Sequence, residues 1–207
     1  MGFGHADGRQ YEILSDSVKA VVDIEGMTCE IGLREGGGSL HMIRALQETK
    51  QQRMHLAIDP YGDIPYYMHE DQNLTARYDN DMKYDTLAQM YKWCQDNKQD
   101  FTFFCLESKE FFNRYFDGVP LYSNHKKTMC NKYACVYLDG QHKSTEVLPE
   151  VLFFAERMDK GAIMVCDDCG FYDHYQVVDP VIRRLGFETF LKGDDSIPNH
   201  KHSYIKL

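Results

Sequence analysis

Short apolar runs alternate with helical patterns along almost the whole chain, and this alternation limits the fold more than any other feature. Continuous apolar runs are typical of strands buried on both faces, whereas apolar residues at three- and four-residue spacing are typical of helices. Strands that alternate with helices form parallel sheets. We therefore predict one α/β domain over residues 1–207, a Rossmann-like fold with a mostly parallel central sheet and helices on both faces. The predicted strands are residues 27–31, 54–58, 101–106, 133–138 and 162–166, with a closing pair at 187–190 and 203–207.

Three segments complete this organisation. Residues 1–25 are predicted to form an N-terminal helical segment, because their apolar residues recur at helical spacing up to Gly26. The connections 60–81 and 113–132 are long, polar and aromatic. Ligands of open α/β sheets bind beyond the carboxyl ends of the strands. We therefore expect both connections to be substrate-side loops.

Composition and charge exclude several classes of protein. Hydrophobic residues make up 43% of the chain and aromatic residues 13%, which excludes a disordered chain. The net charge of −9 opposes binding to the phosphates of a nucleic acid. No apolar stretch is long enough for a membrane span, and the first residues lack the pattern of a secretion signal. An odd number of cysteines, seven, favours reduced thiols and a cytoplasmic location. A homo-oligomer is left open.

A glycine-rich turn at residues 30–39 joins the first predicted strand to the next helix. Gly32 and Gly36 let the backbone approach a ligand with no Cβ in the way. Amide groups at the start of the following helix donate to negative groups of a ligand. A tight turn without a ligand is an equally good interpretation. The turn departs from the dinucleotide-binding pattern, because Leu33 and Arg34 stand where a second glycine is expected.

Asp59 ends the second predicted strand, 27 residues beyond Gly32. An acidic residue at this place can accept hydrogen bonds from both hydroxyl groups of a ribose. The alternative is a carboxylate that caps the turn before Pro60. The sequence alone does not separate these two interpretations.

Three aspartates follow two neighbouring predicted strands. Asp139 ends one strand, and Asp167 and Asp168 end the next. Because the ends of neighbouring parallel strands lie about 5 Å apart, these carboxylates are expected to crowd together. Their repulsion favours a hard divalent cation such as Mg²⁺ between them. The alternative is that one or two of them cap loops. Asp167 and Asp168 cannot both point the same way from an extended strand, so the strand is expected to end there.

His142 lies three residues beyond Asp139 and is the candidate general base. Histidine accepts a proton near neutral pH, and a nearby cation makes a substrate hydroxyl more acidic. Histidines are more often structural or exposed, and only the position beside Asp139 distinguishes this one from the other eight. Gln141 and Lys143 are the neighbours that would take the role instead.

Together these segments resemble the class I S-adenosylmethionine-dependent methyltransferases, most of all the macrocin and mycinamicin sugar O-methyltransferase group. The resemblance covers about residues 11–186 and includes a pattern shared with catechol-type O-methyltransferases, a metal triad on the same two strand ends with a basic residue placed like His142. The matching segments, in the family's order, are EIGLREGGGS at 30–39, DPYGDIP at 59–65, LDGQHKST at 138–145 and VCDD at 165–168.

The resemblance implies a role for each site residue. Glu30 and Gly32 would flank the methionine part of S-adenosylmethionine, Asp59 would hold its ribose, and Ser108 would lie near the adenine. The remaining candidate cofactor-binding residues are Gly36, Ser39 and Asp139, and the residues that match the family's magnesium site are Asp139, Asp167 and Asp168. The sugar enzymes usually carry a second acid two residues after the first aspartate, and this chain has Gln141 there.

The predicted function is therefore transfer of a methyl group from S-adenosylmethionine to a hydroxyl of a small acceptor, such as a sugar or polyol, with Mg²⁺ or another divalent cation. His142 and Asp139 are the predicted catalytic residues. Two alternatives belong to other classes: an NAD(P)-dependent oxidoreductase on a similar sheet, and a methyltransferase-like subunit that binds a partner without catalysis. The missing second glycine counts against the first alternative, and the retained acidic residues count against the second.

Overall fold

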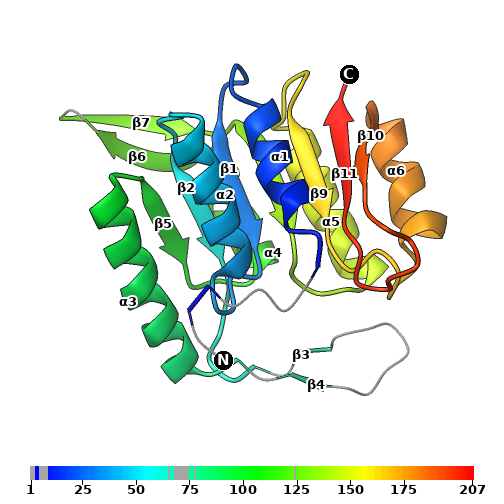
Figure 1. Cartoon of the computed structure of the whole chain (residues 1–207), viewed down its shortest axis with the longest axis horizontal. Coiled ribbons are helices and arrows are strands. Elements are labelled where there is room, and N and C mark those ends of the chain that lie inside the picture. Colours follow the sequence, from blue (N-terminus) through cyan, green and yellow to red (C-terminus); the bar gives the residue numbers. More distant parts are fainter. Residues whose placement is uncertain (1–2, 5–8, 65, 68–74, 77, 124) are drawn as a thin grey trace.

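Seven strands form the central sheet of the computed structural model, which describes residues 3–4, 9–64, 66–67, 75–76, 78–123 and 125–207 (Figure 1). The order across the sheet is β10-β11-β9-β8-β1-β2-β5. Strands β9, β8, β1, β2 and β5 are parallel, and β11 runs antiparallel to its neighbours β9 and β10. The predicted mostly parallel sheet is confirmed. The bounds are β1 Met27–Ile31, β2 His55–Ile58, β5 Phe101–Phe104, β8 Tyr133–Leu138, β9 Ile163–Cys166, β10 Phe187–Lys192 and β11 His202–Lys206.

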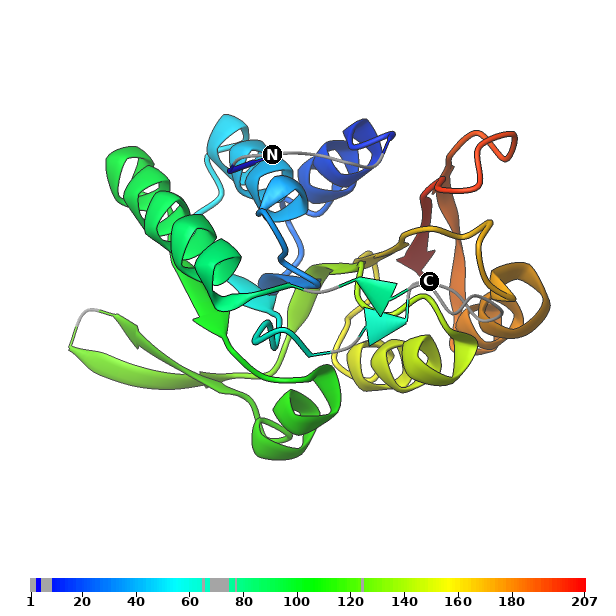
Figure 2. The ribbon, with the colours of Figure 1, turned by 90° about the horizontal axis from the view of Figure 1, so that it is seen from below.

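Helices cover both faces of this sheet, as predicted. Figure 2 shows α1, α2 and α3 on one face and α4, α5 and α6 on the other. A π-helical turn, η1 (His174–Val178), leads into α6. Among the described residues, no helix combines the length and apolar character that a membrane crossing requires. The helices are α1 Glu12–Ala20, α2 Gly37–Glu48, α3 Asn80–Asn97, α4 Ser108–Arg114, α5 Ser144–Ala155 and α6 Asp179–Arg184.

Strand β8 shows why the buried strands appear as continuous apolar runs. All six of its residues are buried. Successive side chains of a strand point to opposite faces. Accordingly, Val136 and Leu138 pack into the core shared with α5, whereas Cys135 and Tyr137 pack into the core shared with α1 and α2. Burial on both faces fixes the strand and thereby the position of the residues that follow it.

The segment 113–132 is not a substrate-side loop, and that prediction is wrong. Its residues contain an antiparallel hairpin of β6 (Val119–Ser123) and β7 (Lys126–Cys130). The hairpin lies at the amino end of β8, away from the carboxyl ends of the parallel strands (Figure 1). Four of the five residues of β7 are exposed, so the strand lacks the apolar alternation by which a sequence is recognised as β structure.

The segment 60–81 lies at the carboxyl ends of the strands, where its described residues Pro60, Tyr61, Ile64 and Tyr78 line a cavity. It also contains a short antiparallel pair, β3 (Tyr66–Tyr67) and β4 (Thr75–Ala76). The role of this segment on the substrate side stays a prediction.

Candidate functional site

A cavity of about 350 Å³ opens at the carboxyl ends of β1, β2, β5, β8 and β9. Seven of the residues singled out in the sequence as cofactor, metal or catalytic candidates come together here, among them Ser108, the first residue of α4. The predicted site residues that line the cavity are Gly32, Asp59, Ser108, Asp139, His142, Asp167 and Asp168. The cavity is lined further by Ile31, Arg34, Ile58, Pro60, Tyr61, Ile64, Tyr78, Leu106, Glu107, Lys109, Gly140, Gln141, Glu146, Glu150, Phe171 and Asn199.

Gly32 is required by close packing at the end of β1. Its φ of +91° is one that residues with a side chain rarely adopt, and a Cβ at this position would lie 2.0 Å from the carbonyl oxygen of Asp139. The two strand ends therefore approach each other as closely as a backbone allows. This contact brings Gly32 and Asp139 to the same part of the cavity wall.

Glu30, Gly36 and Ser39 do not line the cavity, although the resemblance implies that they bind the cofactor. Gly36 is the N-cap of α2, with a left-handed φ of +81°. Ser39 is fully buried and donates a hydrogen bond to the Glu30 carboxylate. Gly38 has no room for a Cβ, which would lie 2.0 Å from Oε1 of Glu30. These residues shape the turn and hold Glu30 beneath it.

A buried chain of side chains supports Glu30. The Ser39 hydroxyl lies 2.7 Å from Nε2 of His55, and Nδ1 of His55 lies 2.9 Å from the Thr28 hydroxyl. Burial lowers the pKa of His55 to about 3, so its ring is neutral. Burial also raises the pKa of Glu30 to about 8. Neither His55 nor Thr28 was singled out in the sequence, where each appears as one polar residue within an apolar run.

Asp59 fits both of its predicted interpretations. Its carboxylate caps the neighbouring turns, because Oδ2 accepts a hydrogen bond from the Arg34 backbone amide at 3.0 Å and Oδ1 accepts one from the Tyr61 amide at 2.9 Å. The same carboxylate lines the cavity. Burial raises the pKa of Asp59, and the two amide donors oppose that rise. The turn therefore holds the carboxylate in a fixed orientation at the cavity wall.

The acidic residues of β8 and β9 converge around His142. Its Nε2 lies 3.3 Å from Oδ2 of Asp168 and 3.7 Å from Oδ1 of Asp139. The His142 side chain is nearly buried, at 8% exposed. Strand β9 ends at Cys166, as expected, and Asp168 adopts a left-handed φ of +50°, which aspartate tolerates better than most residues. A proton taken up at Nε2 would thus face two carboxylates.

Asp167 is paired with a buried lysine. Its Oδ1 lies 2.7 Å from Nζ of Lys201, and its Oδ2 accepts a hydrogen bond from the Tyr137 hydroxyl at 2.6 Å. Lys201 is fully buried, and its ammonium lies 4.4 Å from the centre of the Tyr11 ring. Both oxygens of Asp167 are therefore engaged within the protein, by a cation that the sequence reasoning missed.

The charges of this cluster shift its pKa values in opposite directions. Burial and the Asp167 charge raise the pKa of Asp139 well above its usual range, and the same two causes raise that of Asp168 to about 7. Burial also acts against ionisation of Asp167, but the Lys201 ammonium outweighs it and lowers the pKa of Asp167. One ammonium is thus shared among three carboxylates, and two negative charges are left in excess when all are ionised.

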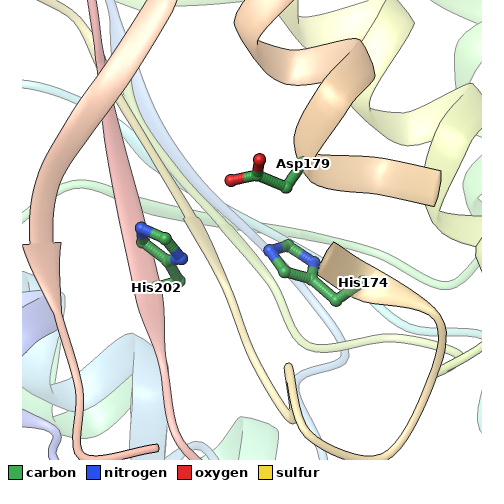
Figure 3. Close-up of side chains that lie close together, drawn as sticks. All are labelled: His174, Asp179 and His202. Atoms are coloured by element: carbon green, nitrogen blue, oxygen red, sulfur yellow. The ribbon is translucent and has the colours of Figure 1, made fainter. Parts of the chain in front are cut away.

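A second cluster of candidate metal ligands lies outside the cavity. Figure 3 shows His174, Asp179 and His202 pointing toward one another, and within the described part of the chain their donor atoms are the group that lies within 4.8 Å of one another. The Tyr204 hydroxyl occupies the middle of this group. It lies 2.7 Å from Nε2 of His174, 2.8 Å from Oδ1 of Asp179 and 3.1 Å from Nδ1 of His202.

The hydrogen bonds of this second cluster are complete without a metal. The Tyr204 hydroxyl donates to Asp179 and accepts from both imidazoles, whose second nitrogens lie 3.0 Å from the Tyr172 hydroxyl and 3.1 Å from the Thr189 hydroxyl. A metal ion would have to displace the Tyr204 hydroxyl. We therefore assign the cluster to the packing of β11 against η1 and α6.

The neutral histidines of this cluster predict acid sensitivity. Burial lowers the pKa of His174 to about 3 and that of His202 to about 4, below the unfolded value of about 6.5. The unfolded chain therefore binds more protons than the folded chain. As the pH falls below about 6.5, each histidine thus lowers the free energy of unfolding. In urea unfolding between pH 6 and 4.5, we expect the His202→Gln variant to lose about 1.4 kcal/mol less per pH unit than wild type. Equal slopes would contradict this assignment, and the carboxylates present in both proteins cancel in the comparison.

A sequence model of a family described as a methyltransferase domain matches residues 29–169. No curated protein sequence matches the chain. Among solved structures, CalS11, described as a calicheamicin methyltransferase, aligns with a TM-score of 0.63 and 14% identity over 95% of this chain and 77% of its own.

Two further solved structures share this fold. The O-methyltransferase NovP aligns with a TM-score of 0.59 and 16% identity over 95% of this chain and 78% of its own. TomG from Streptomyces achromogenes, an O-methyltransferase of tomaymycin synthesis solved with S-adenosylmethionine, aligns with a TM-score of 0.56 and 10% identity over 95% of this chain and 79% of its own. At these identities the likeness establishes the fold.

Proposed function

The chain belongs to the methyltransferase domain family, and from that premise we propose that it transfers a methyl group from S-adenosylmethionine to a hydroxyl of a small acceptor. One observation carries the proposal. A single cavity holds the Gly32 turn, the fixed carboxylate of Asp59, and His142 between two carboxylates. A cationic sulfonium donor suits a cavity wall of this acidity, and a hydroxyl acceptor needs the base that His142 offers.

The two ends of the cavity would have different roles, cofactor binding at one and proton transfer at the other. Asp59 would accept hydrogen bonds from the ribose hydroxyls, because its carboxylate is held at the wall by two backbone amides. His142 would take the proton of the acceptor hydroxyl at Nε2. Asp139 and Asp168 would stabilise the resulting imidazolium, which lies within 4 Å of both. When bound, S-adenosylmethionine would supply the electrophilic methyl group, and S-adenosylhomocysteine would be the leaving group.

The residues present fit a divalent cation, but with two carboxylate ligands instead of the predicted three. Burial and the Asp167 charge oppose ionisation of Asp139 and Asp168, and a dication between these two carboxyl groups would favour their ionised forms. Asp139 and Asp168 would hold it through their oxygens, whereas Asp167 is already engaged by Lys201 and Tyr137. The cation would lower the pKa of an acceptor hydroxyl. We propose Mg²⁺ at this place, with a sugar or polyol as the acceptor class that the sequence resemblance favours.

The test separates donor, acceptor and metal. Calorimetric titration of the purified protein with S-adenosylhomocysteine and with NADH is expected to give binding of the first and none of the second. Labelled S-adenosylmethionine is then incubated with a panel of sugars, polyols and catechols, with Mg²⁺ or with a chelator. Labelled product that depends on Mg²⁺ is the expected result. Binding of NADH alone would overturn the methyltransferase proposal, and full transfer in chelator would overturn its metal part.

A further inference from the structure

The β6–β7 hairpin has an outer face that is apolar and exposed. Its inner face packs against the core through Val119 and Leu121. Side chains alternate between the two faces of a strand, so Pro120 and Tyr122 lie on the outer face. Met129 is paired with Pro120 and therefore shares that face. Tyr122 is 74% exposed and Met129 is 49% exposed.

A hairpin of this kind is expected to have a partner. Two strands alone are at best marginally stable in water, and only the inner face of this hairpin is packed. Exposed apolar residues that gather on one face and are bordered by charged residues mark sites of interaction between proteins. The outer face is bordered by Lys127, which is paired with Tyr122. Covering this face would therefore stabilise the hairpin.

Helix α3 carries a second exposed apolar stripe. Tyr84, Ala88 and Tyr91 are all exposed, and their spacing of four and three residues places them along one side of the helix. The Tyr91 ring also lies edge-on against Phe101 of β5, with the ring centres 5.1 Å apart. Strand β5 is the edge strand of the central sheet. Tyrosine and methionine, the main residues of both surfaces, are enriched in protein interfaces.

The stripe on α3 and the hairpin lie at the same end of the molecule, as both Figure 1 and Figure 2 show. Their positions along the strands differ. Helix α3 begins close after Tyr78, which lines the cavity at the carboxyl ends of the strands, whereas the hairpin lies at the amino ends (Figure 1). A two-fold axis at this end that makes the sheets of two copies antiparallel therefore brings each hairpin to the start of the other copy's α3.

The charges of the two surfaces favour a second copy as the partner. The hairpin contains Lys126 and Lys127 and no acidic residue, within a chain of net charge −9. Asp81 and Asp85 are exposed at the start of α3, whereas Lys83 between them is only partly exposed. Opposite charges that face each other across an interface speed association and fix its register. The two-fold arrangement places the lysines opposite the aspartates at both ends of the interface.

We propose that this end of the molecule is a surface for self-association, where two copies of the chain form a two-fold dimer with each hairpin against the other copy's α3. The inference is independent of the proposed reaction, because the hairpin and the stripe on α3 lie outside the cavity. Direct pairing of two β7 strands is a poorer arrangement, because exposed lysines on an edge strand oppose such pairing.

The test is sedimentation velocity of the full chain at about 1 to 100 μM, because dimer formation depends on protomer concentration. We expect a dimer whose dissociation constant rises at least about 10-fold between 0.1 M and 1 M salt, since salt screens exposed charges. Lys126→Glu, Lys127→Glu is expected to raise the dissociation constant about 100-fold at low salt, because like charges then face each other. Adding Asp81→Lys, Asp85→Lys to the same chain is expected to restore it to within about 10-fold of wild type.

The control is Lys160→Glu, Arg184→Glu, which makes the same change in net charge at two exposed positions outside α3 and the hairpin. We expect this variant to dimerise like wild type. A monomeric wild type would overturn the proposal in favour of a different partner protein. A dimer that the hairpin variant leaves intact would overturn the proposed surface.

Two further outcomes test the details of the interface. Failure of the four-fold variant to recover, with a circular dichroism spectrum like that of wild type, would overturn the pairing of the hairpin with α3. If the hairpin variant does not fold, Tyr122→Ser replaces it, because this change removes an exposed ring without altering charge. Its dissociation constant is expected to rise about 10-fold, and an unchanged value would equally overturn the proposal.

Discussion

Replacing Lys201 by Met is expected to lower the free energy of unfolding by about 3–5 kcal/mol, because it leaves the Asp167 carboxylate buried without its cation. Lys201 is fully buried, and its Nζ lies 2.7 Å from Oδ1 of Asp167. Burial alone would lower the pKa of Lys201, but the charges of Asp167 and Asp139 outweigh it and raise that pKa. The Lys201 side chain is therefore charged at neutral pH.

The measurement is urea unfolding at pH 7, followed by circular dichroism. The double variant Lys201→Met, Asp167→Asn removes both charges and is expected to regain at least half of the loss, which a purely steric effect of methionine would not allow. Lys192→Met is the matched control, since Lys192 pairs with Asp195 at the surface with 43% of its side chain exposed. We expect that change to cost less than about 1 kcal/mol. A Lys201→Met variant as stable as the control would contradict the assignment.

Lys201 also shows where reasoning from the sequence ends. It lies 34 residues beyond Asp167, within a short polar segment that resembles an exposed loop. Strand β11 returns antiparallel beside β9, with His202 opposite Cys166, and this pairing places Lys201 next to Asp167. Strand order is a property of the folded sheet that apolar periodicity does not encode. The sequence therefore predicts a metal ion as the positive charge among the three aspartates, whereas in the structure Lys201 supplies part of that charge.

The convergence of Asp139, Asp168 and His142 was predictable for a physical reason. Parallel strands that are buried on both faces are recognisable as apolar runs, and their carboxyl ends meet at one edge of the sheet. Residues that follow such runs must therefore come together. Glu150, another residue of the cavity wall, had no comparable signal, because on a helix its burial depends on α4, a helix that the sequence did not predict.

Substituting His142 by Gln is expected to reduce the rate of methyl transfer by about 10²- to 10⁴-fold, the range that a positioned general base contributes. His142 lines the cavity, and its Nε2 faces Asp168 at 3.3 Å and Asp139 at 3.7 Å. Glutamine keeps a polar side chain but cannot take up a proton. The affinity for S-adenosylhomocysteine is expected to stay within about 3-fold, because the predicted contacts of the cofactor lie at Asp59 and at the Gly32 turn.

The rate is measured under single-turnover conditions with an acceptor found in the screen, so that product release does not mask the chemical step. His125→Gln is the control, since His125 is exposed at the turn between β6 and β7, away from the cavity. A His142→Gln enzyme with the rate of this control would remove His142 as the base. Loss of cofactor affinity together with rate would instead make His142 part of the binding surface, because a general base acts on the acceptor proton and leaves the donor's contacts intact.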